Sequence, residues 1–155
     1  MGDDLRETAR DRAAVAGALA EAERRLSESE TAELHTYAGQ AARLLGDGEA
    51  AIRHLSRALE LVPSARARVR LGEAYRCADR LAEAERELRG ALSESQTADD
   101  EHYALQHLGK TLVDAGCREE AAAALEHALA LRKAVGEAGL VASTEAALDR
   151  LRREP

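Results

Sequence analysis

The chain has 155 residues, a formal net charge of -7 and 45% hydrophobic residues, but only 2% aromatic residues. This length favours one domain that is large enough to bury a core. Its abundance of Ala, Leu, Glu and Arg is typical of a helical protein and disfavours β-sandwiches, barrels and disordered chains. The acidic net charge argues against nucleic acid as the main partner.

The N-terminus and the cysteines favour a cytoplasmic protein. The chain begins with acidic residues, whereas a signal peptide begins basic and continues apolar. No stretch approaches the about 18 consecutive apolar residues of a membrane span, so no membrane partner is expected. Cys77 and Cys117 are the only cysteines, which excludes a disulfide framework. Only Lys110 and Lys133 are lysines among 22 basic residues, and this usage favours a bacterial source of actinobacterial type.

The first predicted element is one long amphipathic helix over residues 4–28. Its last residues and those that follow, LSESETA from Leu26, recur as LSESQTA from Leu92. This recurrence indicates that the helix corresponds to the second helix of a preceding, decayed unit. We therefore expect it to cap one end of a stack of repeats.

An internal repeat follows this helix. Gly39, Gly72 and Gly109 are spaced by 33 and then 37 residues, and the same two offsets relate four further sets of small or apolar residues. These sets are Ala51, Ala84 and Ala121; Leu55, Leu88 and Leu125; Ala58, Ala91 and Ala128; and Leu59, Leu92 and Leu129. Because all the sets share one pair of offsets, we infer three copies of one unit.

Each copy divides into two amphipathic helices joined by a turn, at residues 46–48, 77–80 and 114–117. Asp47 and Asp79 are predicted to cap the second helices, and Pro63 is predicted to end the second helix of the first copy. Small residues such as Gly39 let the two helices of a hairpin approach closely. Leu55 and Leu88 are expected to fill the space between hairpins.

This pattern resembles the tetratricopeptide repeat (TPR) family, whose units are helical hairpins of about 34 residues. Gly39, Ala51, Leu55, Ala58 and Pro63 match the family pattern in the first copy, and the resemblance covers roughly residues 32–134. It implies an all-α fold, a right-handed α-solenoid of about three hairpins, in a single domain.

The resemblance also sets the expected boundaries of that domain. The repeats are expected at residues 32–64, 65–97 and 98–134, within one domain that spans residues 1–155. A C-terminal helix at residues 138–153 is expected to cap the end of the stack opposite the helix at residues 4–28.

The sequence carries no recognisable catalytic, cofactor or metal motif. His102 and His107 are five residues apart, which places them on different faces of a helix, and no two histidines have the i, i+4 spacing of a helical metal site. Cys77 and Cys117 are interpreted as turn residues rather than as redox or metal-binding residues. We therefore expect no catalytic residue, no cofactor and no metal.

The resemblance implies a partner-binding groove, because the first helices of stacked hairpins line a concave wall. The expected groove consists of the surface positions of the three first helices: Glu33, Thr36, Gln40, Arg43, Arg66, Val69, Arg70, Glu73, Arg76, Tyr103, Gln106, His107 and Lys110. Basic residues outnumber acidic ones in this set, which favours an acidic partner segment. The alternative is that Arg is simply the common polar residue of this chain.

One function of the family is tested by residue type alone. Some TPR modules clamp the acidic C-terminus of heat-shock chaperones with Lys, Asn and Arg side chains. The corresponding positions here are Thr36, Gln40, Arg70, Tyr103 and His107, and none matches in residue type. We therefore do not expect that clamp.

Together these features predict a noncatalytic protein–protein interaction module that binds a peptide or protein segment in its groove. The alternative is a self-assembling or accessory scaffold subunit for biosynthetic or regulatory enzymes, and a homo-oligomer remains open. A small-molecule sensor or an unrecognised enzyme is a third hypothesis, which a deep enclosed pocket would favour.

Overall fold

The computed structural model describes the backbone of residues 2–153 and the side chains of residues 11–153. The described residues form eight α-helices and no strand, so the all-α prediction is confirmed. The chain divides into two compact units, Met1–Pro63 (unit 1) and Ser64–Pro155 (unit 2). The expectation of a single domain for the whole chain stays a prediction.

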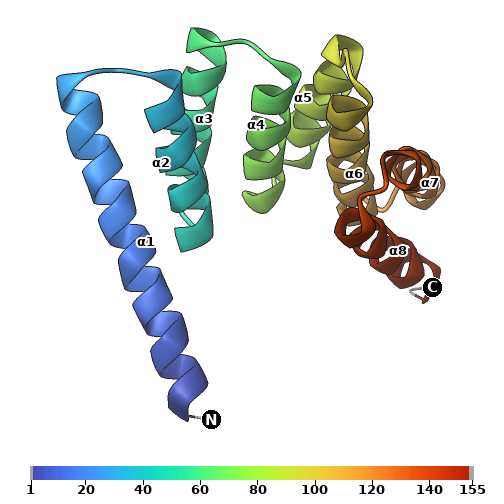
Figure 1. Cartoon of the computed structure of the whole chain (residues 1–155), viewed down its shortest axis with the longest axis horizontal. Coiled ribbons are helices and arrows are strands. Elements are labelled where there is room, and N and C mark those ends of the chain that lie inside the picture. Colours follow the sequence, from blue (N-terminus) through green and yellow to red (C-terminus); the bar gives the residue numbers. More distant parts are fainter. Residues whose placement is uncertain (1, 154–155) are drawn as a thin grey trace. The chain divides into compact units, whose positions relative to one another are not determined.

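Unit 1 consists of α1 (Gly2–Glu28), α2 (Ala32–Leu45) and α3 (Gly48–Leu61), and consecutive helices run antiparallel (Figure 1). Thr31 begins α2, because its side chain accepts a hydrogen bond from the Leu34 N–H at 3.2 Å. Asp47 begins α3 in the same way, accepting from the Ala50 N–H at 2.9 Å, as predicted. Beyond the end of α3, Pro63 separates this unit from the next helix.

Unit 2 consists of two hairpins and a final helix. The hairpins are α4 (Ala65–Cys77) with α5 (Leu81–Glu94) and α6 (Ala98–Asp114) with α7 (Arg118–Val135). The final helix, α8 (Ala138–Arg153), has the predicted bounds. Its Leu148 is buried beside Leu125 of α7, so α8 covers apolar residues that would otherwise be exposed at the end of the hairpin.

The recurring spacing of glycine and leucine corresponds to the same contact in each of the three hairpins. A Cβ atom added to the glycine of the first helix would lie only 2.6 to 2.7 Å from Cγ of the leucine of the second helix. The three pairs are Gly39 with Leu55, Gly72 with Leu88, and Gly109 with Leu125. These leucines therefore pack inside the hairpin, which corrects the expectation that they mainly fill the space between hairpins. Leu88 also belongs to a buried cluster with Leu108 of the next hairpin.

The turns inside the hairpins repeat with the same offsets. Gly46, Asp79 and Gly116 all have left-handed backbone conformations, with φ of 82°, 59° and 77°. The prediction that Asp79 caps α5 is wrong. The N-cap is Arg80, which makes no side-chain capping bond, because the cap follows the left-handed residue by one position.

Candidate binding site

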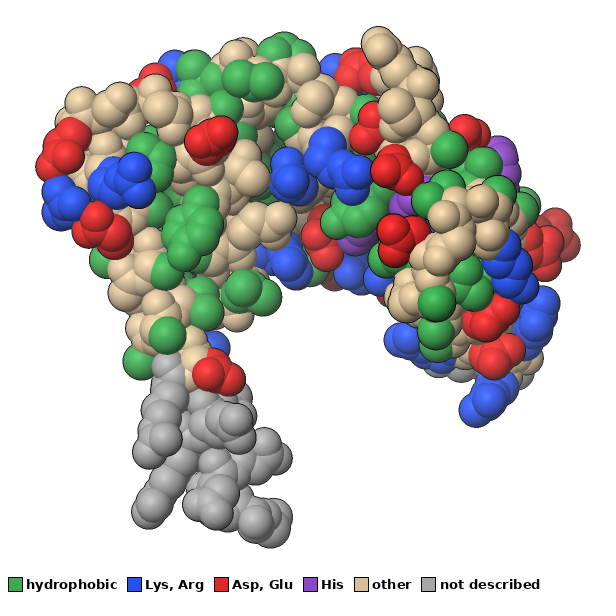
Figure 2. All heavy atoms as spheres, in the orientation of Figure 1, with side chains coloured by type: hydrophobic (Ala, Val, Ile, Leu, Met, Phe, Trp, Pro, Cys, Tyr) green, Lys and Arg blue, Asp and Glu red, His purple; other side chains and the backbone are tan. Residues whose placement is uncertain are grey.

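The first helices of the two hairpins in unit 2 present a polar face, here called the α4–α6 face. Arg66, Arg70 and Glu73 follow one another at four and three residues along α4, so they lie on one side of the helix. On α6, Tyr103 and Lys110 are two turns apart, and all five side chains are half-buried. Figure 2 shows Lys and Arg side chains gathered over this part of unit 2, with acidic side chains among them.

Arg66 joins the two helices across this face. Its guanidinium carbon lies 4.2 Å from the centre of the Tyr103 ring, and its Nε lies 3.7 Å from Oδ1 of Asp100. A guanidinium over an aromatic ring is attracted by the negative face of the ring. The contact therefore holds Arg66 against α6 rather than leaving it freely exposed.

Three predicted surface positions are buried instead. Val69, Gln106 and His107 are 1%, 2% and 7% exposed, so the expectation that they line an open groove is wrong. Val69 lies in the apolar cluster that also contains Leu88. Gln106 accepts a hydrogen bond from Thr144 of α8 at 2.9 Å. The physical reason is that α6 packs against four other helices of unit 2, which leaves it few exposed positions.

The other four predicted positions, Glu33, Thr36, Gln40 and Arg43, lie on α2 in unit 1. Glu33 is exposed and the other three are half-buried. Arg43 donates to Oε1 of Gln40 at 3.4 Å. A single groove that joins these residues to the α4–α6 face stays a prediction.

The cations of the α4–α6 face differ in their partners. Arg76 donates from Nη1 to Oδ2 of Asp114 at 2.8 Å, which joins the ends of α4 and α6. Arg70 and Lys110 make no hydrogen bond or ion pair with any residue whose side chain the structure describes. These two half-buried cations are therefore available to a ligand.

A pocket of about 210 Å³ lies among α4, α6, α7 and α8 and is here called the cationic pocket. It is lined by Arg76, Lys110, Val113, Asp114, Leu125, Ala147, Arg150 and Leu151. The pKa of Lys110 is lowered, chiefly because burial disfavours its charged form and because Arg76 repels it, while Glu73 acts in the opposite direction. Arg150 is not among the predicted groove residues, because residues 138–153 are predicted only as a cap. The spacing of Ala147, Arg150 and Leu151 already placed them on one face of that helix.

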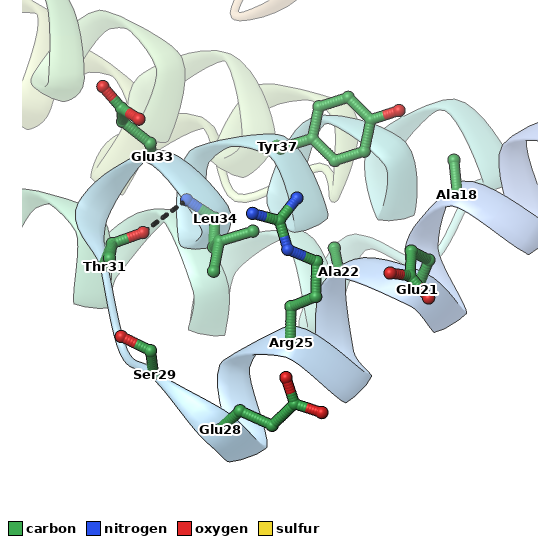
Figure 3. Close-up of a pocket in the computed structure, with 10 residues that line it drawn as sticks. All are labelled: Ala18, Glu21, Ala22, Arg25, Glu28, Ser29, Thr31, Glu33, Leu34 and Tyr37. Carbon is green, nitrogen blue, oxygen red and sulfur yellow. Dashed lines mark hydrogen bonds between the residues drawn. The ribbon is translucent and has the colours of Figure 1, made fainter.

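A second pocket, of about 670 Å³, lies between α1 and α2 in unit 1. Figure 3 shows Arg25 extending from α1 toward Leu34 and Tyr37 of α2, with Ala22 between the helices. Tyr37 is 56% exposed. Of the predicted groove residues, only Glu33 lines this pocket.

Two histidines of unit 1 form a half-buried pair. Nδ1 of His35 lies 3.0 Å from Nδ1 of His54, and the outer Nε2 atoms lie 3.1 Å from Glu30 and 3.6 Å from Glu23. Burial lowers the pKa of His54, and His35 and Arg53 lower it further, whereas Glu23 raises it. Among the described side chains, no group of three or more His, Cys, Asp or Glu is placed to hold a metal ion.

Cys77 ends α4 and Cys117 precedes α7, and both are exposed and free. None of the helices in the described part of the chain is both long enough and apolar enough to span a membrane.

These features define an all-α fold built from repeated helical hairpins, which is a TPR-like fold. The fold is similar to that of MamA. One crystal structure of MamA is 21% identical, with a TM-score of 0.67 over 92% of this chain and 89% of that one. A second, described as a crystal structure of MamA protein, is 22% identical, with a TM-score of 0.65 over 99% and 88%.

A third structure, the MamA RS-1 ArsTM double mutant, is 18% identical, with a TM-score of 0.66 over 97% of this chain and 92% of that one. No protein-family model matches the chain, and no curated protein matches it. At these identities the similarity shows the fold alone.

Proposed function

We propose that this chain is a noncatalytic protein–protein interaction module that binds a peptide or protein segment on the α4–α6 face. The observation that carries this proposal is the pair of half-buried cations without partners, Arg70 and Lys110, on neighbouring first helices. Their buried stems offer apolar contact, while their charged ends remain free to bind a partner. The proposal extends to the expected groove residues of α2, Glu33, Thr36, Gln40 and Arg43.

The charge of this face favours an acidic segment. Arg66 and Arg76 are already paired with Asp100 and Asp114, so they contribute less to binding than the unpaired cations. Removing the charge of Arg70 or Lys110 therefore removes attraction for a ligand without breaking an internal hydrogen bond or ion pair. Complementary charge of this kind mainly accelerates association and gives specificity, and salt weakens it.

The experiment compares two charge reversals in the same hairpin. Arg70→Glu reverses an unpaired cation on the α4–α6 face, and Arg86→Glu reverses an exposed cation on α5. Tagged proteins are used to capture partners from native cell extract, and each purified partner is then titrated by calorimetry at several salt concentrations. Reversal of Arg43, Arg66 and Arg76 is less informative, because it also breaks the contacts of Arg66 and Arg76 with α6.

We expect Arg70→Glu to lower the affinity for the captured partner by at least about tenfold and to reduce the salt dependence of binding. Arg86→Glu is expected to bind like the wild type. Equal affinity of the wild type and Arg70→Glu would contradict binding on this face.

The alternative is a self-assembling or accessory scaffold subunit, and one feature of unit 1 favours it. Tyr37 and Leu44 are 56% and 63% exposed, and they lie two turns apart on the same side of α2. Figure 2 shows hydrophobic side chains over α1 and α2. Light scattering across concentrations tests this alternative, since a mass that rises for the wild type and stays monomeric for Leu44→Glu would support it.

A further inference from the structure

The lining of the cationic pocket combines charged and apolar side chains. Arg76, Lys110 and Arg150 come from three different helices, and Asp114, which Arg76 binds, is the only acidic lining residue. Val113, Leu125, Ala147 and Leu151 supply the apolar part of the lining. Formally, three positive charges and one negative charge surround one small cavity.

This arrangement is electrostatically unfavourable while the pocket is empty. Lys110 and Arg150 make no ion pair or hydrogen bond with residues 11–153, and the buried Nε of Arg76 has no hydrogen-bond partner there. The cations near helix C-termini are partly compensated by the helix dipoles, but Lys110 lies before the last turn of α6. Burial chiefly lowers the pKa of Lys110, and repulsion by Arg76 lowers it further. A bound anion would compensate the positive charges of the pocket.

The position of Arg150 is held by the packing of α8. The guanidinium of Arg118 in α7 donates to the carbonyl oxygen of Leu151, and Leu151 is buried. Farther along α8, buried Arg132 of α7 donates from Nη1 to Oγ1 of Thr144 at 2.6 Å. These contacts fix α8 near its middle and near its C-terminal end, so Arg150 is preorganised for a ligand.

We propose that the cationic pocket binds a dianionic phosphoryl group. The net charge of the lining is about +2 when Lys110 is protonated, and a phosphoryl monoester carries about -1.5 to -2 at neutral pH with three strong acceptor oxygens. The unpaired donors of three helices would meet those oxygens. If the partner segment carries the phosphoryl group, this proposal deepens the proposed function and rests on it. A small phosphate ester is a second source of the same group.

The first test uses inorganic phosphate at constant ionic strength, followed by amide NMR shifts and titration. Arg150→Met removes a lining cation, and Arg153→Met is the matched control, because it removes an exposed cation one turn away on the same helix. We expect saturable shifts at Val113 and Arg150. We also expect a Kd that rises at least about fivefold in Arg150→Met and stays within twofold of wild type in Arg153→Met.

Lys110→Met and Lys110→Arg form a second pair that guards against a folding defect. Both replacements keep a long side chain, and only Lys110→Arg keeps the charge. We expect Lys110→Met to lose phosphate binding and Lys110→Arg to restore at least part of it, with unchanged circular dichroism. Equal losses in Arg150→Met and Arg153→Met, or no saturable binding, would overturn the proposal.

Further titrations separate the anion type and its source. Acetate that binds as tightly as phosphate would overturn the dianion assignment. A partner peptide that binds more tightly when phosphorylated on Ser or Thr, but not when Glu replaces that residue, supports a phosphorylated segment. Stronger binding of glycerol phosphate than of such a peptide supports the small-ester source.

The same titrations separate failure of the two proposals. Phosphate binding by a chain that captures no protein segment would leave the pocket standing and overturn the proposed function. Capture of a segment whose binding depends on Arg70, without any binding of phosphate, would support the proposed function and overturn the phosphoryl proposal.

Discussion

At the residue scale, the stability of each hairpin rests on one close contact between a glycine and a leucine. In the second copy, Leu88 is fully buried and its Cγ occupies the space where a Cβ on residue 72 would stand. Glycine is therefore required at position 72 for the approach of two helices, although it is a poor helix former. The same close contact at Gly39 and Gly109 explains why these glycines share the repeat offsets.

Leu88→Ala is expected to lower the free energy of unfolding by about 2 to 5 kcal/mol, because it removes buried methyl groups and leaves a cavity. Urea unfolding followed by circular dichroism measures this change. Leu44→Ala, at an exposed position of α2, is the control and is expected to change stability by less than about 0.5 kcal/mol. A cost below about 1 kcal/mol for Leu88→Ala would contradict the packing described here.

Gly72→Ala and Gly90→Ala are expected to act in opposite directions. A methyl group at residue 72 would overlap Leu88 and cost about 1 to 3 kcal/mol, more than the gain of about 1 kcal/mol in helix propensity. At residue 90 the nearest atom, Cδ of Arg68, is 3.4 Å away at ordinary contact distance, so only the gain remains. Thermal unfolding of both variants checks the sign, and stabilisation by Gly72→Ala would be inconsistent with the contact.

At the element scale, the turns and caps decide where each helix begins. Gly46 and Gly116 adopt the left-handed conformation at little cost, whereas Asp79 adopts it with a side chain. Asp47 then caps α3, but Arg80 and Cys117 make no capping bond at the equivalent positions of α5 and α7. The first hairpin therefore has the best turn chemistry of the three.

Asp79→Gly is expected to raise the free energy of unfolding by up to about 1 kcal/mol, because glycine relieves the left-handed strain. Asp47→Ala is the counterpart and is expected to cost about 1 kcal/mol through loss of the cap of α3. Denaturant titration measures both variants. If Asp79→Gly is destabilised, the Asp79 side chain stabilises the fold by more than the left-handed strain costs.

The histidine pair makes unit 1 sensitive to acid. The pKa of His54 lies below its ordinary 6.5 in the folded protein, so below about pH 6.5 the unfolded chain binds more protons than the folded chain. The stabilising contribution is therefore present above pH 6.5 and is lost as the pH falls from 6.5 through the lower folded pKa. His35, Glu23, Glu30 and Arg53 face or influence the pair.

His54→Gln is expected to flatten the loss of unit 1 stability between pH 7 and pH 5. His127→Gln is the control, since His127 is an exposed residue of unit 2. Hydrogen exchange of α2 and α3 amides at several pH values measures the effect locally. Equal pH dependence in the wild type and His54→Gln would rule out the pair as its cause.

At the scale of the whole molecule, the chain consists of two units, and the final helix completes the second. Buried Arg132 of α7 donates to His102 of α6 and to Thr144 of α8, so a polar network joins three helices. No carboxylate faces Arg132 in these bonds. Loss of α8 would therefore leave a buried cation with fewer hydrogen bonds as well as exposed leucines.

A chain that ends after Gly136 is expected to lose about 3 to 6 kcal/mol of unit 2 stability, since it removes the buried side chains of Leu148 and Leu151. Calorimetry and light scattering check the unfolding transition and the solubility. Full-length Arg153→Met is expected to match the wild type in both. An unchanged transition of unit 2 in the truncated chain would show that α8 is dispensable to it.

The helical architecture followed from the sequence because its causes are local. The helix periodicity, the repeat offsets of glycine and leucine, the Asp47 cap and the boundaries of residues 138–153 all depend on neighbours along the chain. The N-cap of α5 was misplaced by one residue, because Asp79 suits both a cap and a left-handed turn.

Tertiary structure decided which polar side chains face outward and which cations have partners. Gln106 and His107 are buried because several helices surround α6, and Arg76 is engaged because the end of α6 presents Asp114 to it. Arg150 joins Arg76 and Lys110 only through the packing of α8. Periodicity places a residue on a face of its own helix, but the neighbour that this face meets depends on contacts between segments distant in the chain.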